Sequence, residues 1–500
     1  MTRTAVRLSL PLLALARLGS AQVISIRTVP VAQGDQFELF PSGRLGMGGV
    51  AIALADTLGD PFSNPATVTR LPGAYVFGSP GVFRVSRRAG GGRSLPLGAA
   101  GRQGPWYGAM MLALQEVDAA QPTPFPQDLI LLDRPLIDPP PGPELGPADR
   151  THGNAYLFAL LGKRFRDRGL SVGASLWWAR LTALDGVDLL YAESARIRQL
   201  GQATDLRLGL LKDWSGARSL EAVLVHHRFG MTHEVTYLDP VWDPGRQQVV
   251  LRPRVEENAD RTRTWGVQLQ YQRPLGTGGW RIGWLGTVNR MSHPKIPNYE
   301  IMNIPRDPGT SHAYNLGIGV ARTWGPAKFG VDLIYEPVWS HTWAEAAAPV
   351  ETSRGDTIPA GGATIENRFR FSNALVRLGL SRDLELTGLG RVVSLQFGLV
   401  VRSVRYGLVQ RDRVQGFRRT LEESWVEWAP TWGLSLRFPE FEIRYRGRAH
   451  HGTGRPGVAP DLRLAAAEAG ANILVAPSGP LTLEAVTVVT HQVSFALPLR

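Results

Sequence analysis

The sequence predicts an all-β fold: a transmembrane antiparallel β-barrel of about fourteen strands with an N-terminal glycine-rich plug. Two observations predict this fold. Apolar and polar residues alternate over long segments, and short and long connections take turns between those segments. Alternation with period two places one set of side chains on each face of a strand. In a membrane barrel the apolar set faces lipid and the polar set faces the lumen.

The composition excludes several other classes of protein. The 500 residues contain no cysteine, which excludes disulfide scaffolds, cysteine nucleophiles and thiolate metal sites. The 56 glycines and 37 prolines are too many for a helical bundle. The formal net charge is +12, and nearly all of the basic residues are arginine. We expect this charge to meet anionic outer-membrane lipids and not nucleic acid, for which the sequence has no motif.

Residues 1–21 are predicted to be a signal peptide. Arg3 and Arg7 precede a short apolar run, and Gly19-Ser20-Ala21 supplies a small-residue cleavage site. The apolar run is about nine residues long, which is too short to span a bilayer. We therefore expect export, and a final location in the outer membrane of a Gram-negative-type bacterium.

Residues 22–104 are predicted to form the plug, or hatch, with a glycine-rich motif at 43–66. Gly46, Gly48 and Ala51 superficially match a dinucleotide fingerprint. No buried strand precedes them and no parallel βαβ pattern follows, so the nucleotide interpretation fails. Glycines that permit close backbone packing suit a compact element inside a barrel. The predicted hatch motif consists of Gly46, Gly48, Gly49, Asp56, Asn64, Pro65 and Ala66.

The run RLGMGGVAIALAD, followed by SNPA, resembles the N-terminal signature of FadL-type outer-membrane proteins. This superfamily includes long-chain fatty-acid transporters and PorV/PorQ-like barrels. Thr67 stands where the family motif has glycine, so the match is incomplete. The resemblance implies a plugged fourteen-stranded barrel. It leaves the cargo open, because some relatives take up hydrophobic molecules and others serve secretion systems.

Residues 105–500 are predicted to form the barrel wall. In one typical strand Trp265, Val267 and Leu269 share a face opposite Gln268 and Gln270. The predicted strands are 105–117, 152–165, 169–182, 203–214, 217–229, 261–274, 278–292, 311–324, 327–341, 366–380, 391–406, 421–437, 440–449 and 485–498. The long connections, 230–260 and 407–420 among them, are expected outside the cell, and the short ones in the periplasm.

One further extended segment, residues 74–85, leaves the number of strands open. It belongs either to the N-terminal segment or to the wall, where pairing with 93–100 would give sixteen strands. The fourteen-strand barrel is the favoured prediction.

Charged and amide side chains on the predicted lumen face are the candidate substrate-contacting residues. They are Gln268, Gln270, Asp332, Glu336, Arg437, Glu442, Arg444 and Arg446. Two interpretations stay open. Such residues commonly brace a barrel wall or hold a plug. Alternatively, the arginines bind the acidic head of an amphipathic cargo, because a guanidinium fork suits a carboxylate.

The favoured function is passive passage of small hydrophobic or amphipathic, fatty-acid-like molecules across the outer membrane, without a cofactor, a metal or catalysis. The first alternative is a scaffold or shuttle for a secretion-system or cell-surface protein partner. The second is a membrane-embedded lipid-modifying enzyme. His491 and Ser494 are three residues apart on one predicted strand and so face opposite ways. That spacing argues against a hydrolase site built from this pair.

Overall fold

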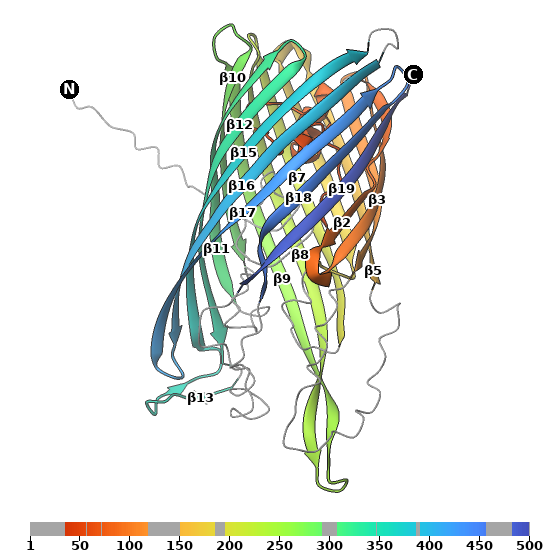
Figure 1. The fold of residues 1–500 in the computed structure, drawn as a ribbon. Helices are drawn as coiled ribbons and strands as arrows, with labels where there is room; N and C mark the ends of the chain where they lie inside the picture. The colour runs from red at the N-terminus through yellow and green to blue at the C-terminus, as the bar shows by residue number, and fades with distance from the viewer. Residues whose placement is uncertain are drawn as a thin grey trace, which may run out of the picture.

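The computed structural model shows a tall closed barrel with its lumen occupied (Figure 1). It describes residues 36–56, 58–71, 73–118, 151–185, 196–292, 308–346, 348–386, 391–456 and 483–499. The predicted signal peptide lies outside these residues. Within them, none of the helices has the length and apolar character needed to cross a membrane.

Short helices and two short strands precede the long strands of the wall. The first elements are η1 (Leu45–Met47), α1 (Asp60–Ser63), η2 (Pro65–Arg70), β1 (Ala74–Gly78), β2 (Gly81–Val85), η3 (Ser86–Arg88) and β3 (Gly91–Gln103). The next are β4 (Trp106–Asp118), β5 (Thr151–Phe165), η5 (Arg166–Arg168), β6 (Leu170–Leu181), β7 (Arg196–Trp214), β8 (Arg218–Asp243), β9 (Gln248–Pro274) and β10 (Trp280–Ser292).

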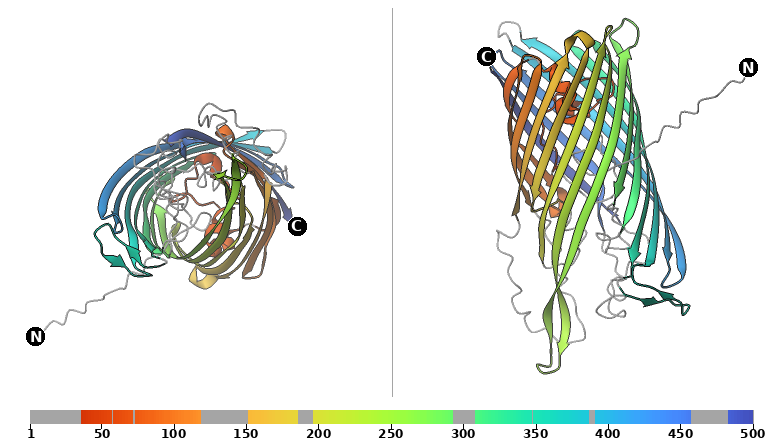
Figure 2. Two further views of the ribbon diagram at one scale, coloured as in Figure 1. Left: turned by 90° about the horizontal axis from the view of Figure 1, so that it is seen from below. Right: turned by 180° about the vertical axis from the view of Figure 1, so that it is seen from behind.

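The second half of the chain continues the same up-and-down path. Its elements are β11 (Gly309–Trp324), β12 (Ala327–Glu345), β13 (Val350–Glu351), β14 (Thr357–Ile358), β15 (Ala363–Leu386), β16 (Arg391–Asp412), β17 (Phe417–Arg437), β18 (Glu442–Pro456) and β19 (Leu483–Leu499). Each long strand pairs antiparallel with its sequence neighbour, and β13 with β14 forms a separate small hairpin. Figure 2 shows the closed ring from below.

The barrel closes where β1 and β2 lie between β19 and β3. Both short strands keep one register with β19, since Gly78 is opposite Phe495 and Gly81 is opposite Gln492. They also keep one register with β3. They are therefore two halves of a single wall strand, interrupted at Ser79 and Pro80. In the described part of the chain sixteen strands form the wall, so the favoured prediction of about fourteen is wrong.

The two additional strands lie in residues 74–103, which the favoured prediction assigned to the plug; the alternative, in which 74–85 pairs with 93–100 to give sixteen strands, is the one found. Their signal is weak because Pro80 divides one strand and glycines interrupt the other. The glycines have a packing reason. A methyl group at Gly92 or Gly98 would overlap the rings of Phe83 or Phe77 on the neighbouring strand. Without side chains at these positions, β3 shows little alternation.

Connections differ sharply between the two ends of the barrel. At one end, here called the short-turn end, neighbouring strands are joined by tight turns such as Gly104-Pro105 and Gly325-Pro326. At the other, the long-connection end, β8 and β9 continue far past the wall as a hairpin (Figure 1). Most of the predicted loop 230–260 is therefore strand, and so is most of 407–420, in β16 and β17.

The outer surface carries the apolar half of each alternating strand. Trp265, Val267 and Leu269 are exposed on this face, while Gln268 is buried on the lumen face. Near the short-turn end, basic side chains lie over aromatic rings. Lys163 Nζ is 4.7 Å from the Trp106 ring and Arg322 is 5.2 Å from the Trp280 ring. Aromatic residues with cations above them are typical of a membrane–water interface.

Because the chain has no cysteine, an engineered cysteine pair tests the closing strand directly. Val85 of β2 lies opposite Val488 of β19, and both side chains are buried in one cluster. We expect Val85→Cys with Val488→Cys to form a disulfide in intact outer membranes, since opposite Cα atoms in such pairs are about 4.5 to 5.5 Å apart.

The matched control combines Val85→Cys with Val486→Cys, which is displaced by one pair along the same face and should cross-link poorly. Cross-linking is read from the mobility shift on a non-reducing gel. Equal yields for the two pairs would contradict the sixteen-strand closure.

Candidate functional site

The lumen of the barrel contains the chain's own N-terminal residues. Figure 2 shows η1, α1 and η2 inside the ring. We call the described residues of 36–73 the interior segment. Leu39, Val50, Ile52 and Val68 of this segment are completely buried. The site at the centre of the barrel is thus made by the interior segment on one side and lumen-facing wall residues on the other.

A row of wall glycines lets the interior segment approach the wall backbone. A methyl group at Gly379 would overlap the carbonyl oxygen of Met47, and one at Gly398 would overlap the amide of Gly48. Similar overlaps with the segment would occur at Gly173, Gly209, Gly283, Gly319 and Gly330. The contacts come from strands on several sides of the barrel, so the segment is seated against the wall around much of its circumference.

The three glycines of the predicted hatch motif meet different requirements. Gly46 has no room for a side chain, because an added Cβ would lie 2.9 Å from the backbone of Gly433. Gly48 and Gly49 have φ values of 67° and 68°, in the left-handed region that glycine adopts without strain. The backbone therefore turns sharply directly after η1, and does so against the inner wall.

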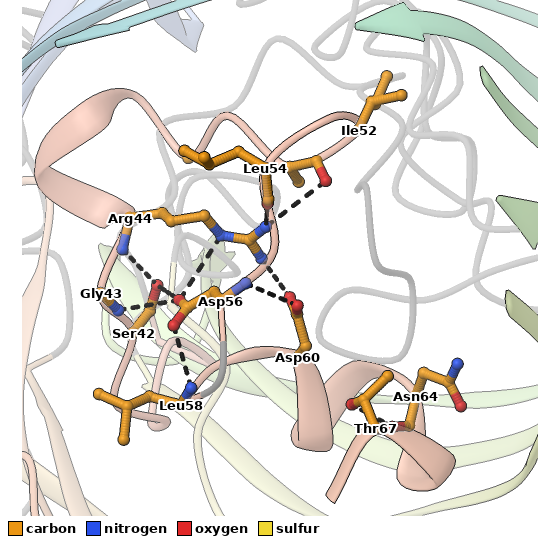
Figure 3. A network of polar contacts seen from close by, with 12 residues as sticks. Ser42, Gly43, Arg44, Ile52, Leu54, Asp56, Leu58, Asp60, Asn64 and Thr67 are labelled. Carbon is orange, nitrogen blue, oxygen red and sulfur yellow. Dashed lines mark hydrogen bonds and ion pairs between the residues drawn. The ribbon is translucent and has the colours of Figure 1, made fainter. Parts of the chain in front are cut away.

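Asp56 organises a polar network within the segment (Figure 3). Its carboxylate accepts hydrogen bonds from the Ser42 hydroxyl at 2.6 Å, the Gly43 amide at 2.9 Å and the Leu58 amide at 3.0 Å. Arg44 lies between this carboxylate, 3.6 Å away, and Asp60, with which it forms a short ion pair. Burial and the nearby Asp56 raise the pKa of Asp60, whereas Arg44 lowers it. Arg44 is therefore the charge that holds the buried Asp56 and the half-buried Asp60 together.

The other half of the predicted motif forms η2 and attaches it to the wall. The Asn64 side chain accepts a hydrogen bond from the Ala66 amide at 3.1 Å, which caps the helix that Pro65 begins. Its amide donates to Glu221 of β8 at 3.0 Å. The Thr67 hydroxyl donates to the Asn64 carbonyl at 2.8 Å, so threonine at the departing position strengthens the same turn.

Two of the predicted lumen residues bind the backbone of the interior segment directly. Asp332, which is fully buried, accepts hydrogen bonds from the Ala51 amide at 2.7 Å and the Ile52 amide at 3.3 Å. Gln270 donates to the carbonyl oxygens of the same two residues, each at 3.2 Å. These side chains thus bind both the donors and the acceptors of one stretch of irregular backbone.

The two predicted lumen arginines on β18, Arg444 and Arg446, here called the arginine stripe, have different partners. Arg446 donates to Glu38 of the interior segment and to Gln492 of β19, both at 2.8 Å. Arg444 has Glu442 as its ion-pair partner, and its Nη1 atom is buried without a hydrogen bond among the described residues. Arg437 lies 3.6 Å from the same Glu442.

Glu336 and Gln268, the remaining predicted lumen residues, do not meet the stripe on β18. Glu336 is fully buried and lies 3.4 Å from Arg402 of β16. Gln268 is buried on the lumen face of β9. All eight predicted residues therefore face the lumen, but they are distributed around it and do not converge on one point.

A small cavity of about 20 Å³ lies between the interior segment and strands β16 to β19. Its lining includes Ser42, Gly43, Gln396, Ser435, Arg444 and Ser494. Arg444 provides positive charge and the serine and glutamine side chains provide polar groups. The cavity has room for about one water molecule as it stands, so a carboxylate would enter only if the interior segment moved.

Sequence reasoning missed several wall residues that hold the segment, among them Arg377, Gln396 and Thr431. Arg377 donates to the Gly49 carbonyl at 3.1 Å and Gln396 to the Gly43 carbonyl at 2.8 Å. The Thr431 hydroxyl both donates to the Gly46 carbonyl and accepts from the Gly48 amide. Alternation places all three on the lumen face, and that register was the signal available for finding them.

Sequence reasoning also missed two apolar clusters on the inner wall. One joins Phe40 and Phe62 of the segment to Phe77, Tyr156 and Phe158 of the wall. The other, called the inner aromatic cluster, consists only of wall residues. Its members are Ala313, Val338, Phe369, Phe371, Val404, Tyr406, Leu408 and Trp425. It lies nearer the long-connection end than Asp332, since Val338 is six residues farther along β12.

The geometry of the histidine and serine on β19 follows the prediction. His491 is on the outer face, where its Nδ1 is 2.9 Å from the Tyr445 hydroxyl, and Ser494 is buried on the lumen face. Among the described residues, no group of three or more histidine, aspartate and glutamate side chains is arranged to hold a metal ion.

The fold and its filled interior define an outer-membrane-type β-barrel with an N-terminal segment in the lumen. No protein-family model matches the chain, and no curated protein matches it. A FadL homologue from Pseudomonas aeruginosa is similar in structure, with 10% identity, a TM-score of 0.44 and coverage of 92% of this chain and 99% of that chain.

Two further solved structures are similar. The Pseudomonas putida toluene transporter TodX has 10% identity and a TM-score of 0.38, covering 95% of this chain and 100% of that chain. A bacterial polysaccharide outer membrane secretin has 8% identity and a TM-score of 0.38, covering 85% and 98%. FadL-type barrels are thus among the structures that this chain resembles, as the motif predicted. Identities near 10% and TM-scores below 0.5 say nothing about its cargo.

Gly398→Ala should unseat the interior segment, because the new methyl group would overlap the backbone at Met47 and Gly48. We expect at least a tenfold rise in hydrogen exchange at amides 44–52 and a larger conductance in planar bilayers. Gly286→Ala is the control, since nothing lies within 4 Å of that position. The same exchange rates in both variants would contradict the seating by wall glycines.

Asp56→Ala should loosen the segment from within. The substitution leaves three donors without their acceptor and removes one of the two carboxylates beside the Arg44 guanidinium, which destabilises the local packing by about 2 to 4 kcal/mol. The measurement is hydrogen exchange at residues 42–60 of the assembled barrel. Asp167→Ala, in the exposed turn η5, is the control. Unchanged protection in Asp56→Ala would show that the network is dispensable.

Proposed function

We propose that the protein conducts small hydrophobic or amphipathic molecules passively across the outer membrane, with the interior segment as the hatch. The single observation that carries this proposal is the inner aromatic cluster. Lumen faces of outer-membrane barrels are ordinarily polar. Here Phe369, Phe371, Tyr406 and Trp425 face inward and form one apolar surface.

The position of this cluster supports a route from outside to inside. Short turns are typical of the periplasmic end of a barrel, which makes the long-connection end extracellular. A hydrophobic molecule entering there would meet the inner aromatic cluster before the interior segment. The segment is held by many single hydrogen bonds and close glycine contacts, so a modest displacement would open a path beside it.

The cavity beside Arg444 supports an amphipathic cargo. Its guanidinium has one buried nitrogen without a hydrogen bond among the described residues, next to polar side chains on three strands and the segment. A cargo carboxylate would supply the missing acceptor, and such charge-assisted bonds are strong. Arg446 is different, because Glu38 and Gln492 already engage it.

Phe371→Ser tests the proposed route. Replacing a buried ring in the inner aromatic cluster by a hydroxyl should remove about 1 to 2 kcal/mol of contact with an apolar cargo, a five- to thirtyfold loss. The measurement is uptake of a fluorescent fatty-acid analogue into proteoliposomes. Phe417→Ser is the control, since Phe417 is 46% exposed and lies outside the cluster.

Equal uptake by wild type and Phe371→Ser would contradict transport along this surface. It would favour the scaffold alternative, for which the projecting β8–β9 hairpin with Trp242, 58% exposed, is the supporting observation. In that case a protein partner should co-purify stoichiometrically and be lost in Trp242→Ser.

Substitutions of Arg444 and Arg446 should have different effects in a ligand-retention experiment. Arg444→Gln should lower retention of decanoate at least tenfold in native mass spectrometry and leave retention of decanol unchanged, because only decanoate presents a carboxylate. Arg446→Gln should instead speed hydrogen exchange around Glu38. If Arg444→Gln reduces both ligands equally, its role is structural and the head-group assignment fails.

A further inference from the structure

Three arginines form a cluster on the outer, lipid-facing surface of the barrel. Arg228 of β8 lies directly opposite Arg263 of β9, and both are exposed. Arg290 of β10 is opposite Trp265 of β9, one pair away on the same face. Like charges directly opposite each other on paired strands are destabilising. An anion placed between these guanidinium groups would remove that penalty.

Trp265 and His226 lie beside the arginine cluster on the same outer face. Their ring centroids lie 4.0 Å apart with the planes tilted by 35°, and the strands place the two residues opposite each other. Arg228 Nε donates to His226 Nε2 at 3.1 Å. His226 Nδ1, 3.1 Å from the Thr264 carbonyl oxygen, is therefore the donor of the second bond. The imidazole is neutral in this arrangement and fixes the direction of the Arg228 guanidinium.

No carboxylate neutralises the cluster within the described part of the chain. The first outward acids along β8 and β9 are Glu234 and Glu257, six residues from the arginine pair and about 20 Å away at a strand's rise per residue. Other arginines on the outer face do have such partners. Arg93 is ion-paired with Glu116, and Arg405 lies 3.6 Å from Glu422.

The cluster stands at one edge of the apolar band. Arg273, near the other end of β9, lies 5.9 Å from the Trp284 ring at the short-turn end. Ten residues separate it from Arg263, about 33 Å along the strand and about 25 Å along the barrel axis at a typical tilt. That height is the thickness of the apolar band of outer-membrane barrels. With the orientation proposed above, the cluster meets the head groups of the outer leaflet.

We propose that Arg228, Arg263 and Arg290 form a binding site for the phosphate groups of a bisphosphorylated lipid head group in the outer leaflet. Planar guanidinium forks match phosphate oxygens bidentately, and three positive charges suit more than one phosphate. The acyl chains would lie along Leu224, Val267 and Val288 on the same outer face. This site is separate from the lumen and does not depend on the transport proposal.

The experiment measures lipid retention by native mass spectrometry of the full-length barrel in mild detergent. The protein is offered bisphosphorylated lipid A, phosphatidylglycerol or phosphatidylcholine at equal concentration. We expect one lipid A per chain, with at least tenfold lower retention of the other two lipids. Arg228→Gln with Arg263→Gln should reduce lipid A retention at least tenfold, and the corresponding double lysine variant should lie between.

Arg405→Gln is the matched control, because it removes an outward arginine that already faces a carboxylate, and it should bind like wild type. The heat-dependent gel mobility of an assembled barrel shows that each variant has folded. Equal lipid A retention by wild type and the double glutamine variant would overturn the site. Equal retention of lipid A and phosphatidylglycerol by wild type would overturn the assignment to a bisphosphorylated lipid.

Discussion

The close approach of the interior segment to the barrel wall is the constraint on which the rest of the lumen depends. An irregular backbone inside a barrel must find partners for its amides and carbonyls, since a buried unpaired group is expensive. Asp332 and Gln270 supply those partners for one stretch, and Thr431 supplies them for another. Their side chains reach the segment only because wall glycines leave room for its backbone. The wall glycines provide space and the polar lumen residues provide hydrogen bonds. Both are needed to hold the segment.

Much of this architecture could be predicted from alternation, because a period of two assigns each side chain to a face whatever the pairing. That is why the eight lumen candidates, from Gln268 to Arg446, all point inward. The partners of those residues could not be predicted. The Ala51 amide and the Asp332 carboxylate are 281 residues apart, and only closure of the barrel brings them together. Strands β1 to β3 were anticipated only in the sixteen-strand alternative, because proline and glycine weaken the alternation that identifies a wall strand.

The inner and outer faces use arginine in contrasting ways. Inside, Arg44 joins Asp56 and Asp60, and Arg446 joins Glu38, so that charge serves to fix backbone in a confined space. Outside, Arg228 and Arg263 face each other beside an aromatic pair, with no acidic residue close along their strands. Inside the barrel, arginine thus holds parts of the chain together. On the outer face, the same type of residue presents a positive charge toward the membrane. A positive net charge calculated from the sequence alone does not distinguish these two uses.

The closing strand has a consequence for assembly. β1 and β2 pair with β19, so the first wall strand meets the last, and the ring stays open until the whole chain has been delivered to the membrane. The interior segment is continuous with β1, and the Ser79 hydroxyl, between β1 and β2, donates to its Leu39 carbonyl. The strand that closes the wall is therefore joined directly to the segment that fills the lumen. The contacts that close the ring and the contacts that hold the segment in the lumen meet at the same place in the wall.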